Sequence, residues 1–155
     1  MVKEKNNEWN KLAKEVDKQN IKQKVYDDVF INFCSADCKG KDVFDYGCGT
    51  GDIAKRIEPI VKSIEAYDES EEMRKTASKK LEGKVYSNYS EIPKNKYDVL
   101  LSSLVLCVVN NKEVIRIIKQ IHNSLNMQGI SYIGFCNPLD FGVKETKLQF
   151  RLPTG

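Results

Sequence analysis

The sequence predicts an α/β protein with a doubly wound, mostly parallel sheet of about five strands and helices on both faces. The first reason is that short β-branched or aromatic segments alternate with longer segments of helical periodicity. The second is the segment 98–105, which is dominated by apolar residues, as is typical of a parallel strand buried on both faces. The third is a glycine-rich turn directly after the first predicted strand. Right-handed crossovers then join the strands into one sheet.

Strand and helix predictions follow from this alternation in chain order. A helical segment covers 8–33, with a break near Asn20, and a loop follows over 35–41. Strands are predicted at 42–46, 63–67, 84–87, 98–105 and 130–136. Helices are predicted between them at 52–57, 70–81 and 112–125. Ser70 is a candidate N-cap for the second of these helices, and Gly83 is expected to end it.

The glycine-rich turn, VFDYGCGTGD, is the most informative stretch of the chain. Its glycines occupy every second position, and an acid flanks them on each side: Gly47, Gly49 and Gly51, with Asp45 and Asp52. Glycine allows a sharp turn and lets a ligand approach the backbone, because no Cβ is in the way. Two carboxylates would repel a pyrophosphate but would attract an ammonium or a sulfonium. This charge argument favours S-adenosylmethionine over NAD as the ligand.

A further acid, Asp68, follows the second predicted strand, seventeen residues after Gly51. A carboxylate at the tip of that strand can accept hydrogen bonds from both hydroxyls of a ribose. Taken alone, Asp68 is better explained as a helix N-cap, and Met73 is better explained as a core residue. The order of the glycines and the acids along the chain is what predicts a nucleotide-type cofactor site.

These motifs resemble those of the class I S-adenosylmethionine-dependent methyltransferases, and the resemblance runs over about 39–138. The segment 45–51 matches the family's first motif, and 68–73 is similar to its second, in which the acid binds ribose and the methionine packs on adenine. Segment 97–106 looks like the fourth strand and its loop, and 126–130 resembles the turn into the fifth strand. The resemblance implies S-adenosyl-L-methionine as cofactor and S-adenosyl-L-homocysteine as product. It implies cofactor contacts from Asp45, Gly47, Cys48, Gly49, Gly51, Asp68, Met73, Asn88, Tyr89 and Ser102.

Two positions depart from the family pattern. Asn88 stands where many members have an Asp that accepts a hydrogen bond from the adenine amino group, and an Asn can still accept it. Cys107 stands where many members have a His, so chemistry that depends on this His is not expected. The sequence identifies no catalytic residue. Methyl transfer can depend largely on alignment of the acceptor, because the sulfonium is already a good leaving group.

Composition narrows the class of protein. The chain has 155 residues, of which 41% are hydrophobic and 30% charged, and these values are ordinary for one soluble domain. No apolar run reaches transmembrane length and the N-terminus lacks a signal-peptide core, so a cytoplasmic location is predicted. A net charge of +3 neither indicates nor excludes nucleic acid. Five cysteines with a single His, His122, do not form a zinc-ligand pattern, so no metal is expected.

We expect two parts in the chain. Residues 1–38 form an N-terminal helical segment, in which Trp9, Tyr26 and Phe30 either line a lid over the cofactor or, the preferred interpretation, pack in the core. Residues 39–155 form the S-adenosylmethionine-binding domain, in which the two last strands of the family fold are expected to be missing.

The predicted function is methyl transfer from S-adenosylmethionine to a small molecule or a modified nucleoside. The alternative is a cofactor-binding module that is catalytically inactive or serves as a partner subunit. A nicotinamide oxidoreductase is disfavoured by Asp45 and Asp52. For the apolar segment 130–136 we expect self-association through its free edge, or a tail, 141–155, that folds back over it, or marginal solubility.

Overall fold

The computed structural model describes Asn10 and residues 21–135 of the chain. In this part, five strands form one sheet in the order β3-β2-β1-β4-β5, and every neighbouring pair is parallel. The strands are β1 (Asp42–Tyr46), β2 (Ser63–Tyr67), β3 (Val85–Tyr86), β4 (Tyr97–Ser103) and β5 (Leu125–Gly134). The α-helices are α2 (Ile21–Cys38), α3 (Asp52–Ile57), α4 (Glu71–Lys80) and α5 (Asn111–Ser124). The short 3-10 helices are η1 (Glu58–Ile60) and η2 (Tyr89–Glu91).

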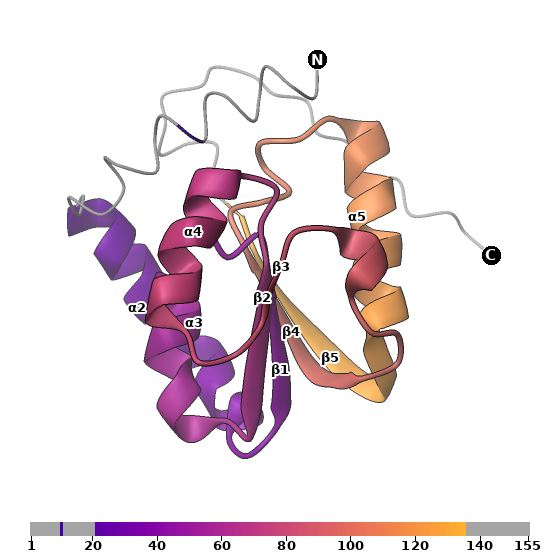
Figure 1. Cartoon of the computed structure of the whole chain (residues 1–155). Helices are drawn as coiled ribbons and strands as arrows, with labels where there is room; N and C mark the ends of the chain where they lie inside the picture. Colours follow the sequence, from indigo (N-terminus) through magenta and orange to yellow (C-terminus); the bar gives the residue numbers. More distant parts are fainter. Residues whose placement is uncertain (1–9, 11–20, 136–155) are drawn as a thin grey trace.

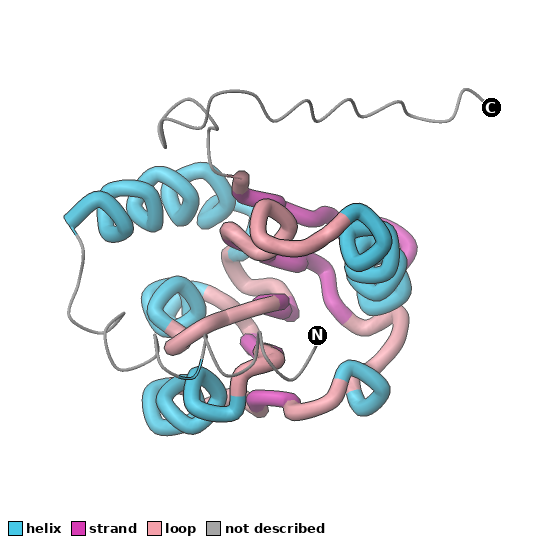
Figure 2. Tube along the Cα trace, turned by 90° about the horizontal axis from the view of Figure 1, so that it is seen from above, coloured by secondary structure: helices cyan, strands magenta, loops and turns pink. Residues whose placement is uncertain are grey.

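Helices cover both faces of the sheet, and this arrangement confirms the predicted doubly wound fold (Figures 1 and 2). Helices α2, α3 and α4 lie against one face, and α5 lies against the other. Strand β1 serves both layers because successive side chains of a strand point to opposite faces. Val43 packs in the core that contains α3 residues, whereas Phe44 packs in the core that contains α5 residues. Both side chains are fully buried.

Three elements have the predicted bounds, and the other predicted elements differ from the structure by one residue or more. The predictions 42–46, 52–57 and 63–67 coincide with β1, α3 and β2. Helix α2 continues to Cys38, so the predicted loop over 35–41 is wrong for most of its length. The reason is tertiary packing: Cys34 and Cys38, one helical turn apart, are both fully buried against the sheet. Strand β4 ends at Ser103 rather than 105, because Leu104 has a left-handed φ of 60°.

The predicted start of the fifth strand at 130 is also wrong, because β5 begins at Leu125, directly after α5. The register against β4 is irregular there: Tyr97 pairs with Leu125, but Val99 pairs with Ile130. The residues in between form a bulge in which the Asn126 side chain accepts a hydrogen bond from the backbone of a residue two positions on. The predicted turn into strand five therefore lies within β5.

Of the two residues predicted to bound helix α4, Ser70 has the expected role and Gly83 does not. Ser70 caps α4, as predicted, and its hydroxyl accepts a hydrogen bond from the Met73 backbone at 3.3 Å. Gly83 has another role than ending this helix: a Cβ placed there would lie 1.7 Å from the carbonyl oxygen of Ile64. Gly83 is thus required by close approach of two backbone segments.

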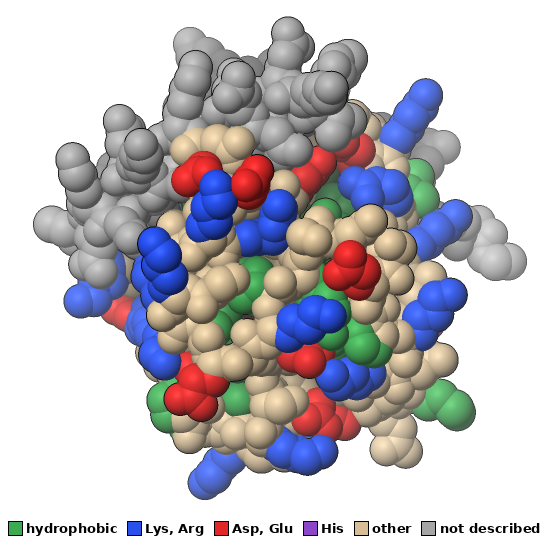
Figure 3. Space-filling model, in the orientation of Figure 1, with side chains coloured by type: hydrophobic (Ala, Val, Ile, Leu, Met, Phe, Trp, Pro, Cys, Tyr) green, Lys and Arg blue, Asp and Glu red, His purple; other side chains and the backbone are tan. Residues whose placement is uncertain are grey.

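Charges of both signs share the surface. On the face shown in Figure 3, Lys and Arg side chains are interspersed with Asp and Glu. Some form ion pairs along one helix, as Lys75 does with Glu71 at 3.0 Å and with Glu72 at 2.8 Å. This face therefore presents no continuous basic track. Within residues 21–135, no helix combines the length and apolarity that a bilayer crossing requires.

Strand β5 is the terminal strand of the described sheet, where it pairs with β4 alone. Apolar side chains are exposed on it and on the adjacent part of α2: Ile130 is 42% exposed and Phe33 is 76% exposed. An unpaired strand edge beside apolar surface favours pairing with a second chain.

We predict that the protein self-associates through this edge. Light scattering after size-exclusion chromatography should show an average mass that rises with protein concentration. Ile130→Lys should reduce the rise, because a charged side chain blunts a strand edge. Ile118→Lys is the matched control, since Ile118 is 46% exposed but lies on α5. A monomer at every concentration would contradict the prediction.

Candidate functional site

A cavity of about 380 Å³ opens at the carboxyl ends of the central strands. Its wall comes from the turn between β1 and α3, the turn between β2 and α4, the loop after β4, one face of α5 and one residue of α2. The strand order changes direction between β1 and β4, because β2 and β4 lie on opposite sides of β1. Ligands of open α/β sheets bind at such a switch point.

Six of the ten predicted cofactor residues line this cavity: Asp45, Gly47, Cys48, Gly49, Asp68 and Met73. They come from three separate elements of the sequence, and the parallel topology brings them together because the strands end at the same edge of the sheet. Burial raises the pKa of the Cys48 thiol, and the charges of Asp45 and Asp68 act in the same direction. The thiol is therefore neutral and has no nucleophilic role at neutral pH.

Gly51 and Ser102 lie outside the cavity wall. Gly51 is the residue before α3 and has a left-handed φ of 82°. A Cβ at this position would lie 3.2 Å from the Cβ of Ala77, so Gly51 lets α3 and α4 approach each other. Ser102 is fully buried in β4, and its hydroxyl oxygen has no partner in the described part of the chain.

Asn88 and Tyr89 also lie outside the cavity wall, on the segment after β3. The Asn88 side chain is exposed and accepts a hydrogen bond from the Ser90 backbone at 3.0 Å, so it caps η2. The Tyr89 hydroxyl donates to the carbonyl of Gln120 on α5 at 2.7 Å. Both side chains serve the packing of η2 in this structure.

Glycine is needed at the first two glycine positions of the turn, 47 and 49, for different steric reasons. Gly47 has φ 77°, and a Cβ there would lie 2.3 Å from a methyl carbon of Val105. Gly49 has φ 55°, and a Cβ there would meet no protein atom within 4 Å. Gly47 is thus required by the loop after β4, whereas Gly49 borders open space in the cavity.

Asp68 joins the glycine turn to the start of α4. One carboxylate oxygen accepts from the Gly49 backbone at 2.9 Å, and the other accepts from the Ser70 backbone at 2.8 Å. Burial raises the pKa of Asp68, whereas these two hydrogen bonds lower it. Asp68 therefore positions the turn and also presents a carboxylate to the cavity.

Asp45 is the most unusual residue of the site. Its side chain is 2% exposed, and within the described residues its Oδ2 atom has no hydrogen-bond partner. Burial, followed by the charges of Asp68 and Asp27, raises the pKa of Asp45 to about 7. A buried, unpartnered acceptor is costly unless a ligand supplies a donor or a cation. This arrangement fits a cationic ligand group.

Asp52 contributes less to the charge of the site than the sequence suggested. Its carboxylate forms an ion pair with Lys80 at 2.8 Å and accepts from the Thr50 hydroxyl at 3.2 Å. The acids whose charges raise the pKa of Asp45 are instead Asp68 and Asp27. Asp45 therefore lies among other carboxylates, as the sequence indicated, but the acids that act on it are Asp68 and Asp27 rather than Asp52.

Some cavity residues were not predicted from the sequence. Asp27 of α2 lies on the same helical stripe as Cys34 and Cys38, and an acid within an apolar stripe was a detectable signal. Arg116 of α5 carried no such signal. It is the single Lys or Arg among the described residues of the cavity wall. No group of three or more potential metal ligands occurs in the described segments.

A glycine turn at a switch point, with an acid at the tip of the next strand, defines a Rossmann-like nucleotide-binding domain. A family model described as "Methyltransferase domain" matches residues 19–144 of the chain. The chain belongs to this family, the S-adenosylmethionine-dependent methyltransferases of Rossmann-like fold. S-adenosylmethionine is the cofactor of the family.

Solved structures show the same fold. The complex of DhpI with S-adenosylhomocysteine superposes with a TM-score of 0.72 at 15% identity, over 85% of this chain and 67% of DhpI. A Methanococcus maripaludis protein, provisionally described as an S-adenosylmethionine-dependent methyltransferase, gives 0.67 at 22% identity, over 81% and 63%. A Haloferax volcanii complex with the methyltransferase activator Trm112 gives 0.62 at 16% identity, over 81% and 59%. No curated protein matches the chain.

The environment of Asp45 predicts a pH dependence of stability. Because the folded-state pKa of about 7 is above the value in the unfolded chain, the stabilising contribution is complete below the unfolded pKa and is lost as pH rises through about 7. Asp45→Asn removes this dependence. Thermal unfolding measured between pH 5 and pH 8 should therefore show that the free energy of unfolding of the variant, relative to that of the unmodified protein, rises with pH. The rise should be on the order of 2 kcal/mol or more.

Asp68, whose pKa is also raised, is present in both proteins, so the difference between them reports on Asp45. Parallel pH profiles of the two proteins would contradict the assignment.

Proposed function

We propose that this chain transfers a methyl group from S-adenosylmethionine to a small molecule or a modified nucleoside. The observation that carries the proposal is the buried Asp45 carboxylate, because Asp45 lines the ligand cavity and its Oδ2 has no hydrogen-bond partner among the described residues. S-adenosylmethionine brings an ammonium and a sulfonium, which suit this carboxylate. A pyrophosphate would be repelled by it, which disfavours a dinucleotide.

In this proposal, different residues of the cavity wall bind different parts of the cofactor. Asp45 accepts a hydrogen bond from the ammonium, and Asp68 accepts from the ribose hydroxyls. Gly49 borders the open space in which the ligand lies against the backbone. Met73 supplies an apolar contact for the adenine, and Tyr67 of the same wall offers an aromatic ring.

When bound, S-adenosylmethionine supplies a methyl group on a good leaving group, and S-adenosylhomocysteine remains after an acceptor nucleophile has taken the methyl. The protein's part is to hold the acceptor in line and to exclude water. Three valines of the loop after β4 give the cavity an apolar wall for this purpose: Val105, Val108 and Val109.

A small acceptor is favoured over a long polyanion. The proposed cofactor takes up the cavity of about 380 Å³, so the charge of the wall and not the volume indicates the acceptor. Its wall holds several carboxylates and one guanidinium, that of Arg116, within the described residues. The interspersed charges in Figure 3 give no track for a phosphate backbone on that face.

A second candidate is a cofactor-binding subunit that acts with a partner or has no activity of its own. The Haloferax volcanii structure, in which a similar fold is bound to the activator Trm112, is the observation that favours it. Methyl transfer by the isolated chain distinguishes the two candidates.

Calorimetry with S-adenosylmethionine, S-adenosylhomocysteine and NAD tests the cofactor. We expect both adenosyl compounds to bind and NAD not to bind. Incubation with methyl-labelled cofactor and a pool of metabolites then tests transfer. Binding of NAD alone would overturn the proposal, and cofactor binding without transfer would favour the partner subunit.

We predict that Asp68→Ala weakens the binding of S-adenosylhomocysteine by about 1.5–3 kcal/mol, because charge-assisted hydrogen bonds to the ribose are lost. The melting temperature should also fall, since the contacts to Gly49 and Ser70 disappear. Calorimetry below the melting transition measures the affinity. Unchanged affinity in the folded variant would refute the role of Asp68.

We predict that Gly49→Ala abolishes cofactor binding, because the new methyl enters the space next to the turn. The positive φ also strains the backbone by about 1–2 kcal/mol. Gly40→Ala is the matched control, because Gly40 has φ 70° and the same open surroundings but lies outside the cavity wall. Both variants should lose similar stability in denaturant titrations, and only Gly49→Ala should lose binding. Equal affinities in the two variants would contradict the prediction.

A further inference from the structure

Helix α2 brings a carboxylate to the cofactor cavity from outside the strand ends. Asp27 is 8% exposed and is the only residue of α2 in the cavity wall, as far as the structure describes the chain. It lines the same cavity as Asp45, and its negative charge is one of the three causes of the raised pKa of Asp45. Asp27 does not belong to the motif that the glycine turn and Asp68 form at the strand ends.

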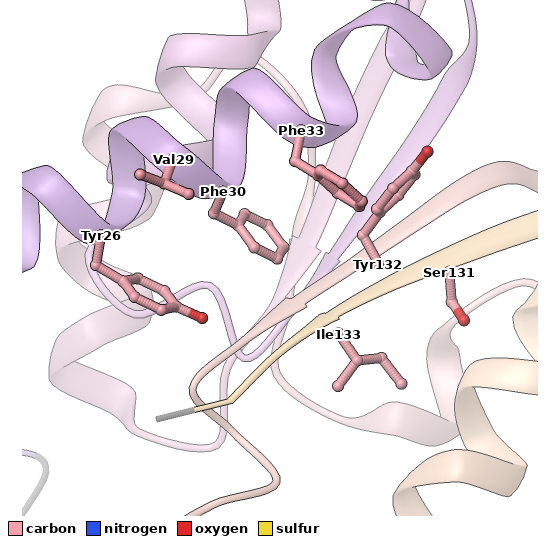
Figure 4. Close-up of a pocket in the computed structure, with 7 residues that line it drawn as sticks. All are labelled: Tyr26, Val29, Phe30, Phe33, Ser131, Tyr132 and Ile133. Carbon is pink, nitrogen blue, oxygen red and sulfur yellow. The ribbon is translucent and has the colours of Figure 1, made fainter. Parts of the chain in front are cut away.

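The residues beside Asp27 fix α2 against the end of β5. A Cβ placed at Gly134 would lie 2.1 Å from the Tyr26 hydroxyl and 3.2 Å from two ring carbons of Phe30. A side chain at position 134 would displace the Tyr26 hydroxyl and press on the Phe30 ring. Figure 4 shows Tyr26 and Phe30 pointing from α2 towards β5. The contact sets the place of Asp27, which lies between these two residues in the helix.

The unpartnered oxygen of Asp45 indicates which of the two cationic groups of the cofactor, the ammonium or the sulfonium, binds at this carboxylate. Asp45 lines the cavity, and its Oδ2 is buried and lacks a hydrogen-bond donor among the described residues. An ammonium carries three N–H groups, so it can donate to two carboxylates at once. A sulfonium carries charge but no hydrogen-bond donor. Two carboxylates in the wall of one cavity therefore fit an ammonium better than a sulfonium.

We propose that Asp27 and Asp45 together bind the α-ammonium of the methionyl part of the cofactor, so that α2 selects ligands that carry an amino group. The inference rests on the proposed function and adds a binding residue from the N-terminal helix. The binding energy of the amino-acid part of the ligand then depends on α2, whereas that of the adenosine part depends on the glycine turn and Asp68.

Two ligands separate these parts. S-adenosylhomocysteine carries the ammonium, whereas 5′-methylthioadenosine has the same nucleoside and thioether without the amino acid. Asp27→Asn should weaken S-adenosylhomocysteine and S-adenosylmethionine by about tenfold or more, because a charge-assisted hydrogen bond is lost. The affinity for 5′-methylthioadenosine should not change. The stoichiometry of its binding also gives the fraction of folded protein in the same sample.

Asp28→Asn is the matched control, since it makes the same change of charge one residue further along α2. Asp28 pairs with Arg56 and lies outside the cavity wall. Its variant should bind all three ligands as the unmodified protein does. If Asp27→Asn does not fold, Asp27→Ser removes the carboxylate without added volume and decides in the same way.

Four results would overturn the inference. Equal weakening of 5′-methylthioadenosine would show that Asp27 acts through the fold. Weakening of S-adenosylmethionine alone would assign Asp27 to the sulfonium. Unchanged affinities would remove Asp27 from the site. Failure of the unmodified protein to bind any adenosyl compound would overturn the proposed function as well, which distinguishes that failure from the other three.

Discussion

The burial of an acid at the tip of the central strand is the constraint on which the site depends. Strand β1 lies in the middle of the sheet, and Asp45 is therefore surrounded by protein on all sides except the cavity. A carboxylate in such a place is stable when it is protonated or when a cation faces it. The charges that raise the pKa of Asp45 are the negative ones of Asp68 and Asp27. The site is thus arranged for a positively charged ligand.

The other features of the site follow from keeping this acid accessible. Glycine at position 47 lets the turn pass beneath the side chain of Val105, and glycine at position 49 leaves the ligand side open. The two hydrogen bonds of Asp68 hold the turn in this shape. Because both backbone N–H groups bind the same carboxylate, the turn is ordered by an acid of the neighbouring strand. The cavity wall is therefore built by β1 and β2 together.

The sequence was sufficient where local chemistry determines structure. Strands β1 and β2 and helix α3 have the predicted bounds, because short segments with apolar and aromatic residues, the glycine turn and Pro59 act within a few residues. The end of α2 was missed because burial of Cys34 and Cys38 against the sheet extends the helix. The start of α5 at Asn111 was close to the prediction, but its capping box of Asn110 and Glu113 was not recognised.

The same division applies to the candidate site. Residues that follow β1 and β2 could be placed at the cavity from the sequence, because parallel strands end at one edge of the sheet, whereas Ser102 of β4 lies outside the cavity wall. Asn88 and Tyr89 could not be placed, because the segment after β3 turns into η2 and its side chains bond within that layer. Asp27 and Arg116 come from helices, whose orientation over the cavity depends on packing such as that of Tyr26 against Gly134.

The charge of the cavity also couples ligand binding to the stability of the fold. Carboxylates that repel one another destabilise the free protein at neutral pH, because each is partly removed from water. A cation bound among them removes this cost and adds its own hydrogen bonds, so the ligand binds the folded state selectively. Helix α2 contributes one of the acids and is held by β5, the terminal strand of the described sheet. A ligand with an ammonium would therefore stabilise the contact between α2 and β5 together with the glycine turn. The same carboxylates that destabilise the ligand-free site therefore make the site selective for a ligand that carries an ammonium.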